Sequence, residues 1–428
     1  MSKSKNDVAW EKIFEKHKIL DRILKDGHVE ITATKINEFR EARLMTKFDH
    51  KSQLPKLFAE NKLSILPTSR GGYVIGTFET FCEFNIEEVE VSPIENPSFL
   101  ESLDYRDITS EATAINCAFV SKILHDFTNE DNLFPTVSGR MSSSSFSFGI
   151  NSSKGMFTIN VGNSQVEIDG GYEGDSSLSL IEAKNYISDD FLVRQLYYPF
   201  KLWNNKIQKK VRPIFLTYSN GIFHLREYSF SDVNYYNSLV LVKYKKYVFQ
   251  EGSFNLETLS QIIDKTTSVK EPEIPFPQAD NFERVINLCE LLNQKEFISK
   301  EEITQNYDFD SRQTDYYTNA GKYLGLINTG KDRSTGQTGS FLTTQGKQIF
   351  NLSLIERQKE FVRLIVSHTA FKQSVKLHLE NGEMPNKETI VQIMKRLKLY
   401  NVGSDSTYFR RASTIAGWTN WIISQIEE

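Results

Sequence analysis

Cysteine is scarce in this sequence, which has three in 428 residues, and Cys82, Cys117 and Cys289 form no C-x-x-C pair. The sequence therefore predicts neither a disulfide framework nor a zinc ribbon. No apolar run reaches the roughly 18 residues that a membrane-spanning helix requires, and the polar residues 1–18 do not resemble a signal peptide. We expect a soluble, cytoplasmic protein without a membrane partner.

An excess of positive charge is also absent. The chain has 51 Lys and Arg residues against 55 Asp and Glu residues, which gives a formal net charge of -4. A nucleic-acid surface would have to be a local patch. Hydrophobic residues at 39% and aromatic residues at 12% are typical of a folded chain.

The motifs of several enzyme classes are missing. The sequence has no H-x-E…C-x-x-C, Walker A or G-x-S-x-G pattern, so deaminase, NTPase and serine-hydrolase chemistry have no support. Residues 72–76, GYVIG, match only half of a GIY-YIG nuclease pattern. A strand is the better interpretation of that segment.

Hydrophobic periodicity and turn residues divide the chain into several segments. In chain order we predict an N-terminal α+β domain with an opening helix over residues 8–25 (1–100), a catalytic domain (101–265), a proline-rich linker (266–280), a winged helix-turn-helix (281–350) and a helical segment (351–428). Whether the first segment contacts DNA, and whether the last is a second winged helix, stays open.

The predicted catalytic domain opens with a helix over residues 110–127, capped by Ser110. Alternating apolar residues then predict strands and one helix. The strands span residues 155–161, 165–169, 178–183, 212–218, 222–228 and 238–248, and the helix spans residues 189–203.

Acidic residues at the ends of two of these strands carry the functional prediction. Asp169 ends one strand, and Glu182 and Lys184 end the next. Residues two apart in a strand point to the same face, so Glu182 and Lys184 converge, and Asp169 joins them if the strands pair. Carboxylates without His or Cys nearby suit Mg²⁺, with Mn²⁺ as a substitute, and disfavour zinc. Lys184 would orient a water or stabilise developing charge.

This arrangement resembles the PD-(D/E)xK nuclease superfamily, with Ile168 at the variable proline position, and the wider chain resembles a type II restriction endonuclease with winged-helix DNA-binding modules. The resemblance implies an α+β fold with a mixed sheet flanked by helices, and Mg²⁺-assisted attack of water on double-stranded DNA. It implies a cognate DNA methyltransferase in the same system. It also implies Glu111 as a further acidic metal contact, and Gln195 as a residue that positions the active site.

Several alternatives remain at this stage. The D-x(12)-E-x-K spacing is short and on its own also fits a solvated strand edge. Glu167 is either a second ligand or a bystander, whereas Glu173 and Asp175 lie among glycines in an expected turn. A structure-selective or repair nuclease and a non-catalytic winged-helix regulator are the alternative functions. The two cuts could come from a homodimer or from one monomer acting twice.

The predicted recognition helix and wing supply the candidate DNA contacts. A further candidate is Arg140, which follows Ser138-Gly139 in an expected turn. The contacts within the winged helix-turn-helix are Arg312, Gln313, Tyr316 and Asn319 on the helix, with Lys331 and Arg333 in the hairpin.

Overall fold

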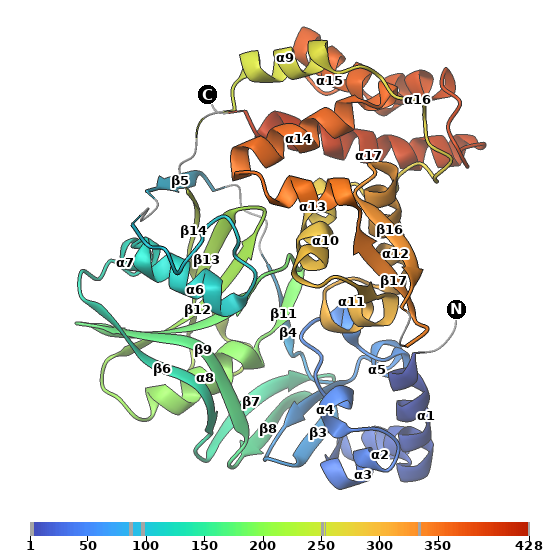
Figure 1. Cartoon of the computed structure of the whole chain (residues 1–428). Coiled ribbons are helices and arrows are strands. Elements are labelled where there is room, and N and C mark those ends of the chain that lie inside the picture. Colours follow the sequence, from blue (N-terminus) through green and yellow to red (C-terminus); the bar gives the residue numbers. More distant parts are fainter. Residues whose placement is uncertain are drawn as a thin grey trace. The chain divides into compact units, whose positions relative to one another are not determined.

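A computed structural model describes residues 4–84, 89–95, 99–249, 252, 254–332 and 335–426 (Figure 1). The chain divides into two compact units. The first unit comprises residues 1–218 and 222–248, and the second comprises residues 219–221 and 249–428. Within the described ranges no helix combines the length and apolarity that crossing a bilayer requires.

The first unit begins with a small helical layer on a three-stranded antiparallel sheet of order β1-β3-β2. Its core includes Trp10, Phe14 and Phe58, whose rings contact one another edge to face. The elements are α1 (Lys5–His17), α2 (Ile19–Asp26), β1 (His28–Thr32), α3 (Ala33–Asn37), α4 (Ala42–Met45), the 3-10 helix η1 (Lys51–Gln53), α5 (Lys56–Glu60), β2 (Ser64–Pro67) and β3 (Gly72–Gly76). The helix predicted over residues 8–25 is two helices, because Lys18 adopts a left-handed conformation with φ 49°.

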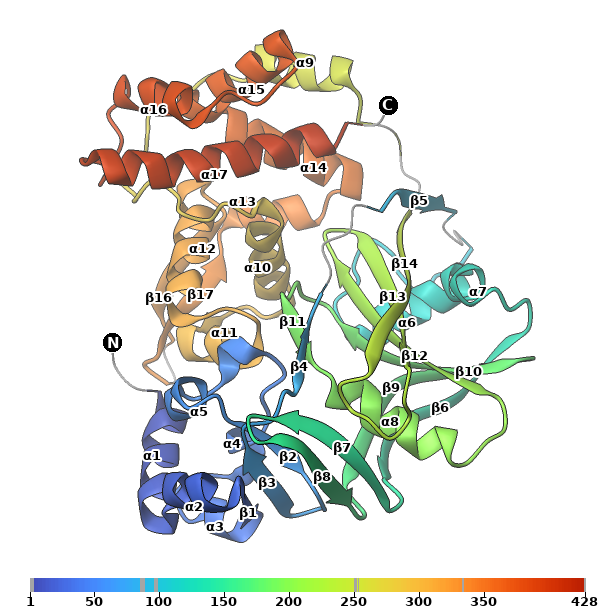
Figure 2. The ribbon, with the colours of Figure 1, turned by 180° about the vertical axis from the view of Figure 1, so that it is seen from behind.

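A seven-stranded mixed sheet of order β5-β14-β13-β12-β10-β9-β6 forms the rest of this unit. The mixed sheet flanked by helices confirms the coarse α+β prediction. Figures 1 and 2 show α6 and α7 on one face and α8 on the other. The elements are β4 (Phe81–Glu83), β5 (Val91–Ile94), α6 (Glu111–Val120), α7 (Ile123–Thr128), β6 (Leu133–Ser142), β7 (Phe146–Ser152), β8 (Gly155–Val161), β9 (Gln165–Gly174), β10 (Ser177–Lys184), β11 (Asp190–Leu192), α8 (Arg194–Asn204), β12 (Lys210–Ser219), β13 (Ile222–Phe230) and β14 (Leu239–Phe249).

Three local predictions in this region were wrong. The helix predicted over residues 110–127 breaks into α6 and α7, because Lys122 adopts a left-handed conformation with φ 66°. The helix predicted over residues 189–203 starts only at Arg194, since residues 190–192 pair with β4 as a short strand. Arg140 lies in strand β6 and pairs with β9, so the expected turn is a bulged strand.

The hairpin turn between β9 and β10 is held by a buried carboxylate. Glu130 accepts hydrogen bonds from the backbone N–H of Asp175 and from the hydroxyls of Ser176 and Ser177, at 3.1, 2.7 and 2.8 Å. A Cβ at Gly174 would lie 2.6 Å from Cδ of Glu130, so glycine is required for this approach. The turn fixes how β9 and β10, which carry the predicted catalytic residues, enter the sheet.

The described residues of the second unit form helices and a small sheet of three strands in the order β15-β17-β16. Its elements are α9 (Leu256–Lys265), α10 (Phe282–Gln294), β15 (Ile298–Ser299), α11 (Lys300–Asn306), α12 (Ser311–Tyr323), β16 (Ile327–Lys331), β17 (Thr338–Leu342), α13 (Thr344–Phe350), α14 (Leu354–Val366), α15 (Thr369–Asn381), α16 (Lys387–Lys395) and α17 (Asp405–Ser424). No strand is assigned in residues 351–426, so this described tail lacks the hairpin that a second winged helix needs. The predicted linker, residues 266–280, has neither helix nor strand, but its Phe276 is buried against Phe371.

Replacing Glu130 by alanine should lower the free energy of unfolding by about 2 kcal/mol, because the donors of the β9–β10 turn lose a charged acceptor. Urea-induced unfolding of the full chain measures the change. Asp131→Ala removes an exposed acid one residue away and serves as the control. Equal effects of the two substitutions would show that Glu130 does not hold the turn.

Candidate active site

Strands β9 and β10 part where the predicted catalytic residues begin. Their paired register ends with Ile181 opposite Gly170. Beyond this point β9 stays paired with β6, while β10 stays paired with β12 as far as Lys184. Oδ2 of Asp169 accepts a hydrogen bond from the backbone N–H of Ala183 at 2.8 Å, in place of a ladder bond. The strands separate here, and the acidic side chains occupy the gap.

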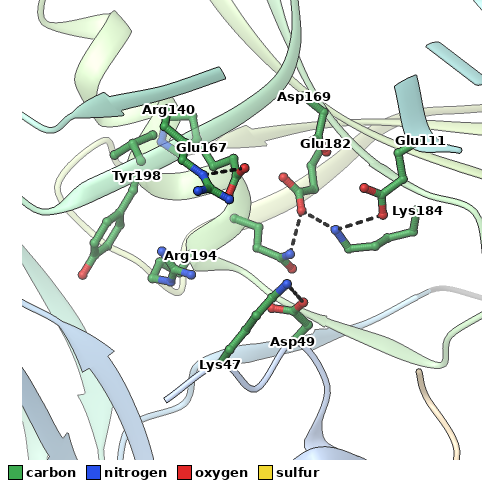
Figure 3. Close-up of a pocket in the computed structure, with 13 residues that line it drawn as sticks. Lys47, Asp49, Glu111, Arg140, Glu167, Asp169, Glu182, Lys184, Arg194 and Tyr198 are labelled. Carbon is green, nitrogen blue, oxygen red and sulfur yellow. Dashed lines mark hydrogen bonds and ion pairs between the residues drawn. The ribbon is translucent and has the colours of Figure 1, made fainter. Parts of the chain in front are cut away.

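The five predicted catalytic residues line one cavity of about 200 Å³ (Figure 3). Nζ of Lys184 donates to Oε1 of Glu182 at 2.6 Å, and Nε2 of Gln195 donates to the same oxygen at 2.6 Å. Nζ of Lys184 also lies 3.8 Å from Oε1 of Glu111, at the start of α6. The two-residue spacing in β10 therefore brings Glu182 and Lys184 together, as the sequence predicts. Helix α6 adds Glu111 and helix α8 adds Gln195.

Burial sets the protonation chemistry of this cavity. It raises the pKa of Glu182 to about 8; Lys184 opposes the rise and Asp169 adds to it. Burial also raises the pKa of Glu111. Burial disfavours the charged form of Lys184, but Glu182 and Glu111 outweigh it, so its pKa is raised well above the usual value. Lys184 is therefore a permanent ammonium beside carboxylates that are costly to ionise.

The donor set fits a hard divalent cation in kind. Asp169, Glu182 and Glu111 offer only oxygen. Oε1 of Gln195 is buried without a hydrogen-bond partner among the described residues. It is therefore a further oxygen whose loss of hydration no hydrogen bond offsets. No set of one oxygen from each of these three carboxylates has all three oxygens within 4.8 Å of one another. The ammonium of Lys184 lies between Glu182 and Glu111 and offsets their repulsion.

Four further polar residues of the cavity wall were missed from the sequence. Lys47 and Asp49 come from the N-terminal segment, and Arg194 and Tyr198 come from α8. Nζ of Lys47 lies 3.7 Å from Oδ2 of Asp49, whose side chain is nearly buried (Figure 3). Arg194 directly precedes Gln195 in the sequence, so its position beside a predicted site residue could have indicated it. Lys47 and Asp49 gave none, because they lie more than 110 residues before the acidic motif.

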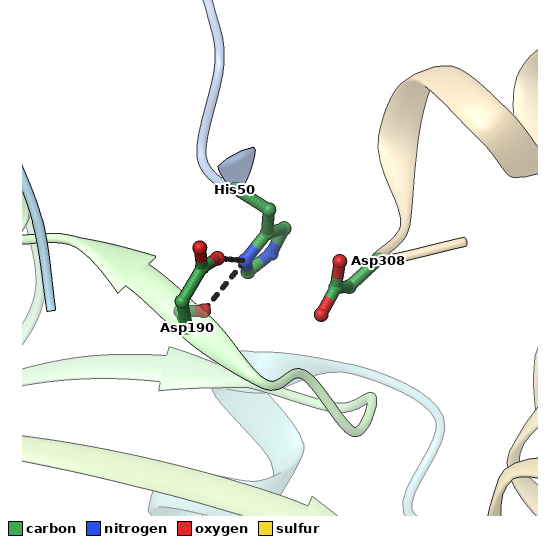
Figure 4. Close-up of side chains that lie close together, drawn as sticks. All are labelled: His50, Asp190 and Asp308. Atoms are coloured by element: carbon green, nitrogen blue, oxygen red, sulfur yellow. Dashed lines mark hydrogen bonds and ion pairs between the residues drawn. The ribbon is translucent and has the colours of Figure 1, made fainter. Parts of the chain in front are cut away.

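A buried histidine fixes the segment that carries Lys47 and Asp49 (Figure 4). Nδ1 of His50 donates to the backbone carbonyl of Asp190 at 2.7 Å, and Nε2 accepts from the Tyr186 hydroxyl at 2.9 Å. The backbone carbonyl of Asp49 accepts from the N–H of Leu192 at 2.9 Å. Residues 49–50 are thus bound to β11, immediately before helix α8.

Of the three acidic residues that the sequence offers as alternatives to Asp169, one lines the cavity and two do not. Glu167 lines the cavity and pairs with Arg140, with 3.0 Å between Oε1 and Nε. Glu173 pairs with Lys209, and Asp175 accepts from Asn132 at the hairpin turn. Glu173 and Asp175 are absent from the cavity wall, whereas Glu167 remains at its edge.

The predicted recognition residues lie in the second unit. Arg312 on α12 and Lys331 on β16 are exposed. Oε1 of Gln313 accepts from the backbone N–H of Asp310 and caps α12, so part of its side chain has a structural role. Tyr316 and Asn319 are half-buried. Arg333 lies outside the described residues.

The raised pKa of Glu182 predicts opposite effects of pH on the metal-free and metal-bound protein. Its folded-state pKa lies above the ordinary glutamate value of 4.5, so the metal-free protein should lose stability as pH rises from about 4.5 to about 8. Mg²⁺ competes with the bound proton, so the increase in melting temperature on adding Mg²⁺ should grow up to about pH 8 and then level off. Thermal unfolding with EDTA and with Mg²⁺ across this range measures both.

Glu182→Gln is the control for this pH profile, because the amide has no proton to displace. Its response to Mg²⁺ should be smaller than that of the wild type and should rise less with pH, because Glu111 keeps its raised pKa while residue 182 no longer titrates. A wild-type response of the same size at every pH would contradict the assigned role of Glu182.

Comparisons with protein families match most of the chain in three pieces. Residues 7–75 match a domain of unknown function (DUF6996), residues 76–248 match a second (DUF6997), and residues 284–427 match a third (DUF7226). No curated protein and no solved structure matches the chain. The first two matched segments meet at Ile75 and Gly76 within β3, and both contribute residues to the cavity.

Proposed function

We propose that this protein is a Mg²⁺-dependent endonuclease that hydrolyses phosphodiester bonds of double-stranded DNA, of the site-specific type II restriction class. The observation that carries the proposal is the convergence of Asp169, Glu182 and Lys184 in one cavity at the separation of β9 from β10. The first five residues of β10 are uncharged and buried, so the buried charged residues at its end point to a functional constraint.

Each side chain has a role that its surroundings support. Asp169 and Glu182 would hold the cation, with Glu111 as a further contact. When bound, Mg²⁺ would polarise the scissile phosphate and lower the pKa of a water molecule. The Lys184 ammonium would stabilise the charge that develops on the phosphate. Gln195 orients the Glu182 carboxylate through its hydrogen bond.

The second unit supports the DNA-binding part of the proposal. Its helices α10, α11 and α12 and its strand order β15-β17-β16 are the elements that a winged helix requires. We assign sequence recognition to α12 and backbone contact to the β16–β17 hairpin. Site-specific cutting implies a DNA methyltransferase that protects the host sites, and two cuts per site imply a homodimer or two successive nicks.

Cleavage of unmodified plasmid DNA tests the catalytic assignment. Wild-type protein with Mg²⁺ or Mn²⁺ should give discrete fragments, and EDTA should abolish them. Asp169→Ala, Glu182→Gln and Lys184→Ala should each lower the cleavage rate by at least about 100-fold, because each removes a charge that acts on the transition state. Glu173→Gln, on the same strand as Asp169 but outside the cavity wall, should cut at the wild-type rate.

Three other outcomes would contradict the proposed function or the assigned site. Cutting restricted to branched or nicked DNA would replace site-specific restriction with structure-selective repair. Binding of DNA without cutting of any form, modified or not, would leave a DNA-binding regulator. Cutting that survives in the three variants would place the active site elsewhere.

Arg312 tests the assigned recognition helix. Arg312→Ala should weaken binding of the cleavable site by about 1 to 3 kcal/mol, with little change in the cleavage rate at saturating DNA. Lys347→Ala, an exposed cation on α13, is the matched control. Equal affinities of the two variants, measured by fluorescence anisotropy in EDTA, would remove Arg312 from the recognition surface.

A further inference from the structure

The N-terminal segment and the predicted winged helix share one topology. In residues 5–76, helical segments precede β1, further helices follow it, and β2 and β3 complete a sheet of order β1-β3-β2. In residues 282–342, α10 precedes β15, α11 and α12 follow it, and β16 and β17 complete a sheet of order β15-β17-β16. All four strand pairings are antiparallel. The chain therefore contains the same small arrangement twice.

The N-terminal segment also differs from the rest of the chain in charge. Residues 1–76 contain fifteen Lys and Arg residues against ten Asp and Glu residues, a formal charge of +5. The remaining residues carry 36 against 45, a formal charge of -9. An excess of cations in one segment of an acidic protein is the kind of charge that binding to a phosphate backbone requires.

The segment is built into the catalytic part of the molecule. Leu66 and Val74 belong to the same buried core as Leu178, Leu180 and other residues of the catalytic sheet. The Tyr198 hydroxyl on α8 donates to the backbone carbonyl of Pro67 at 2.9 Å. Through these contacts β2 and β3 pack against the sheet that carries the cavity.

Lys47 is the cation that this segment brings to the cavity. It lies between α4 and η1, its side chain is 72% exposed, and its ammonium lies 3.7 Å from Asp49. Burial opposes ionisation of Asp49, but Lys184 and Lys47 outweigh it and lower the pKa of that carboxyl, so Asp49 stays ionised and holds Lys47 near the site. An exposed ammonium at the edge of an acidic cavity would meet a phosphate of bound DNA before the metal ligands do.

We propose that residues 5–76 form a DNA-binding module that binds the phosphate backbone beside the scissile phosphate, with Lys47 in contact with a phosphate. This inference rests on the proposed nuclease function, since it names the part of the same site that holds the substrate. Lys47 then binds substrate, and Asp49 is a positioning residue that acts through Lys47.

The test compares Lys47→Ala with Lys387→Ala in the full-length protein. Lys387 is an exposed cation at the start of α16, outside the proposed module and outside the cavity wall, so the two variants lose the same charge. Binding of a labelled DNA duplex in EDTA is measured at several salt concentrations. Loss of one phosphate contact should reduce the slope of log K against log salt by about 0.9 in Lys47→Ala and leave it unchanged in Lys387→Ala.

Cleavage kinetics with Mg²⁺ provide a second readout. Lys47→Ala should raise KM about tenfold, with a smaller change in kcat, and Lys47→Arg should restore most of the affinity because it restores the charge. An unchanged salt slope and KM in Lys47→Ala, in a protein that still cuts DNA, would overturn this inference alone. Failure of the wild-type protein to bind or cut any DNA would overturn the proposed function together with it.

Discussion

The separation of β9 from β10 beyond Ile181 is the constraint on which the candidate site depends. If the ladder continued, Asp169 and Glu182 would lie directly opposite each other, with Cβ atoms about 5 Å apart, and two like charges in such a pair destabilise a sheet. Instead Asp169 satisfies the N–H of Ala183 with its side chain, and β10 continues beside β12. The backbone remains hydrogen-bonded while the two carboxylates gain room for a cation between them.

The buried charges at the end of β10 are hard to explain by stability. Leu178 and Leu180 fill the apolar core, and apolar residues at positions 182 and 184 would extend it at little cost. A buried ion pair is seldom more stable than such a replacement, because both ions lose their hydration. The chain instead keeps a glutamate whose pKa is raised to about 8 and a lysine that compensates it. A cation that binds the site would remove this cost, which is why the arrangement favours a metal-dependent function.

Much of the sheet and the proximity of the central candidate residues could be predicted from local sequence patterns. Strands β8, β10, β12, β13 and β14 follow their alternating residues to within about two positions, and alternation alone places Glu182 beside Lys184. The breaks at Lys18 and Lys122 could not be predicted, because a lysine in the left-handed conformation leaves no signal in the apolar spacing. Lys47 and Asp49 escaped prediction for a different reason. Their place depends on hydrogen bonds between residues 49–50 and β11, and such a tertiary contact has no local pattern.

The repeated arrangement explains why the first segment was difficult to interpret from its sequence. Residues 5–76 and 282–342 share an order of elements without a sequence repeat that can be recognised, because such a small fold needs only apolar residues on one face of each element. Where the second segment has the continuous helix α12, the first has α4, η1 and α5, and the interruption contains Lys47 and Asp49. In a regular helix the 3.6-residue period would decide whether Lys47 and Asp49 are buried or exposed. The irregular segment is free of this period, so it can follow β11 and reach the cavity. The same topology therefore contains a continuous helix in one copy and, in the other, an irregular segment that forms part of the cavity wall.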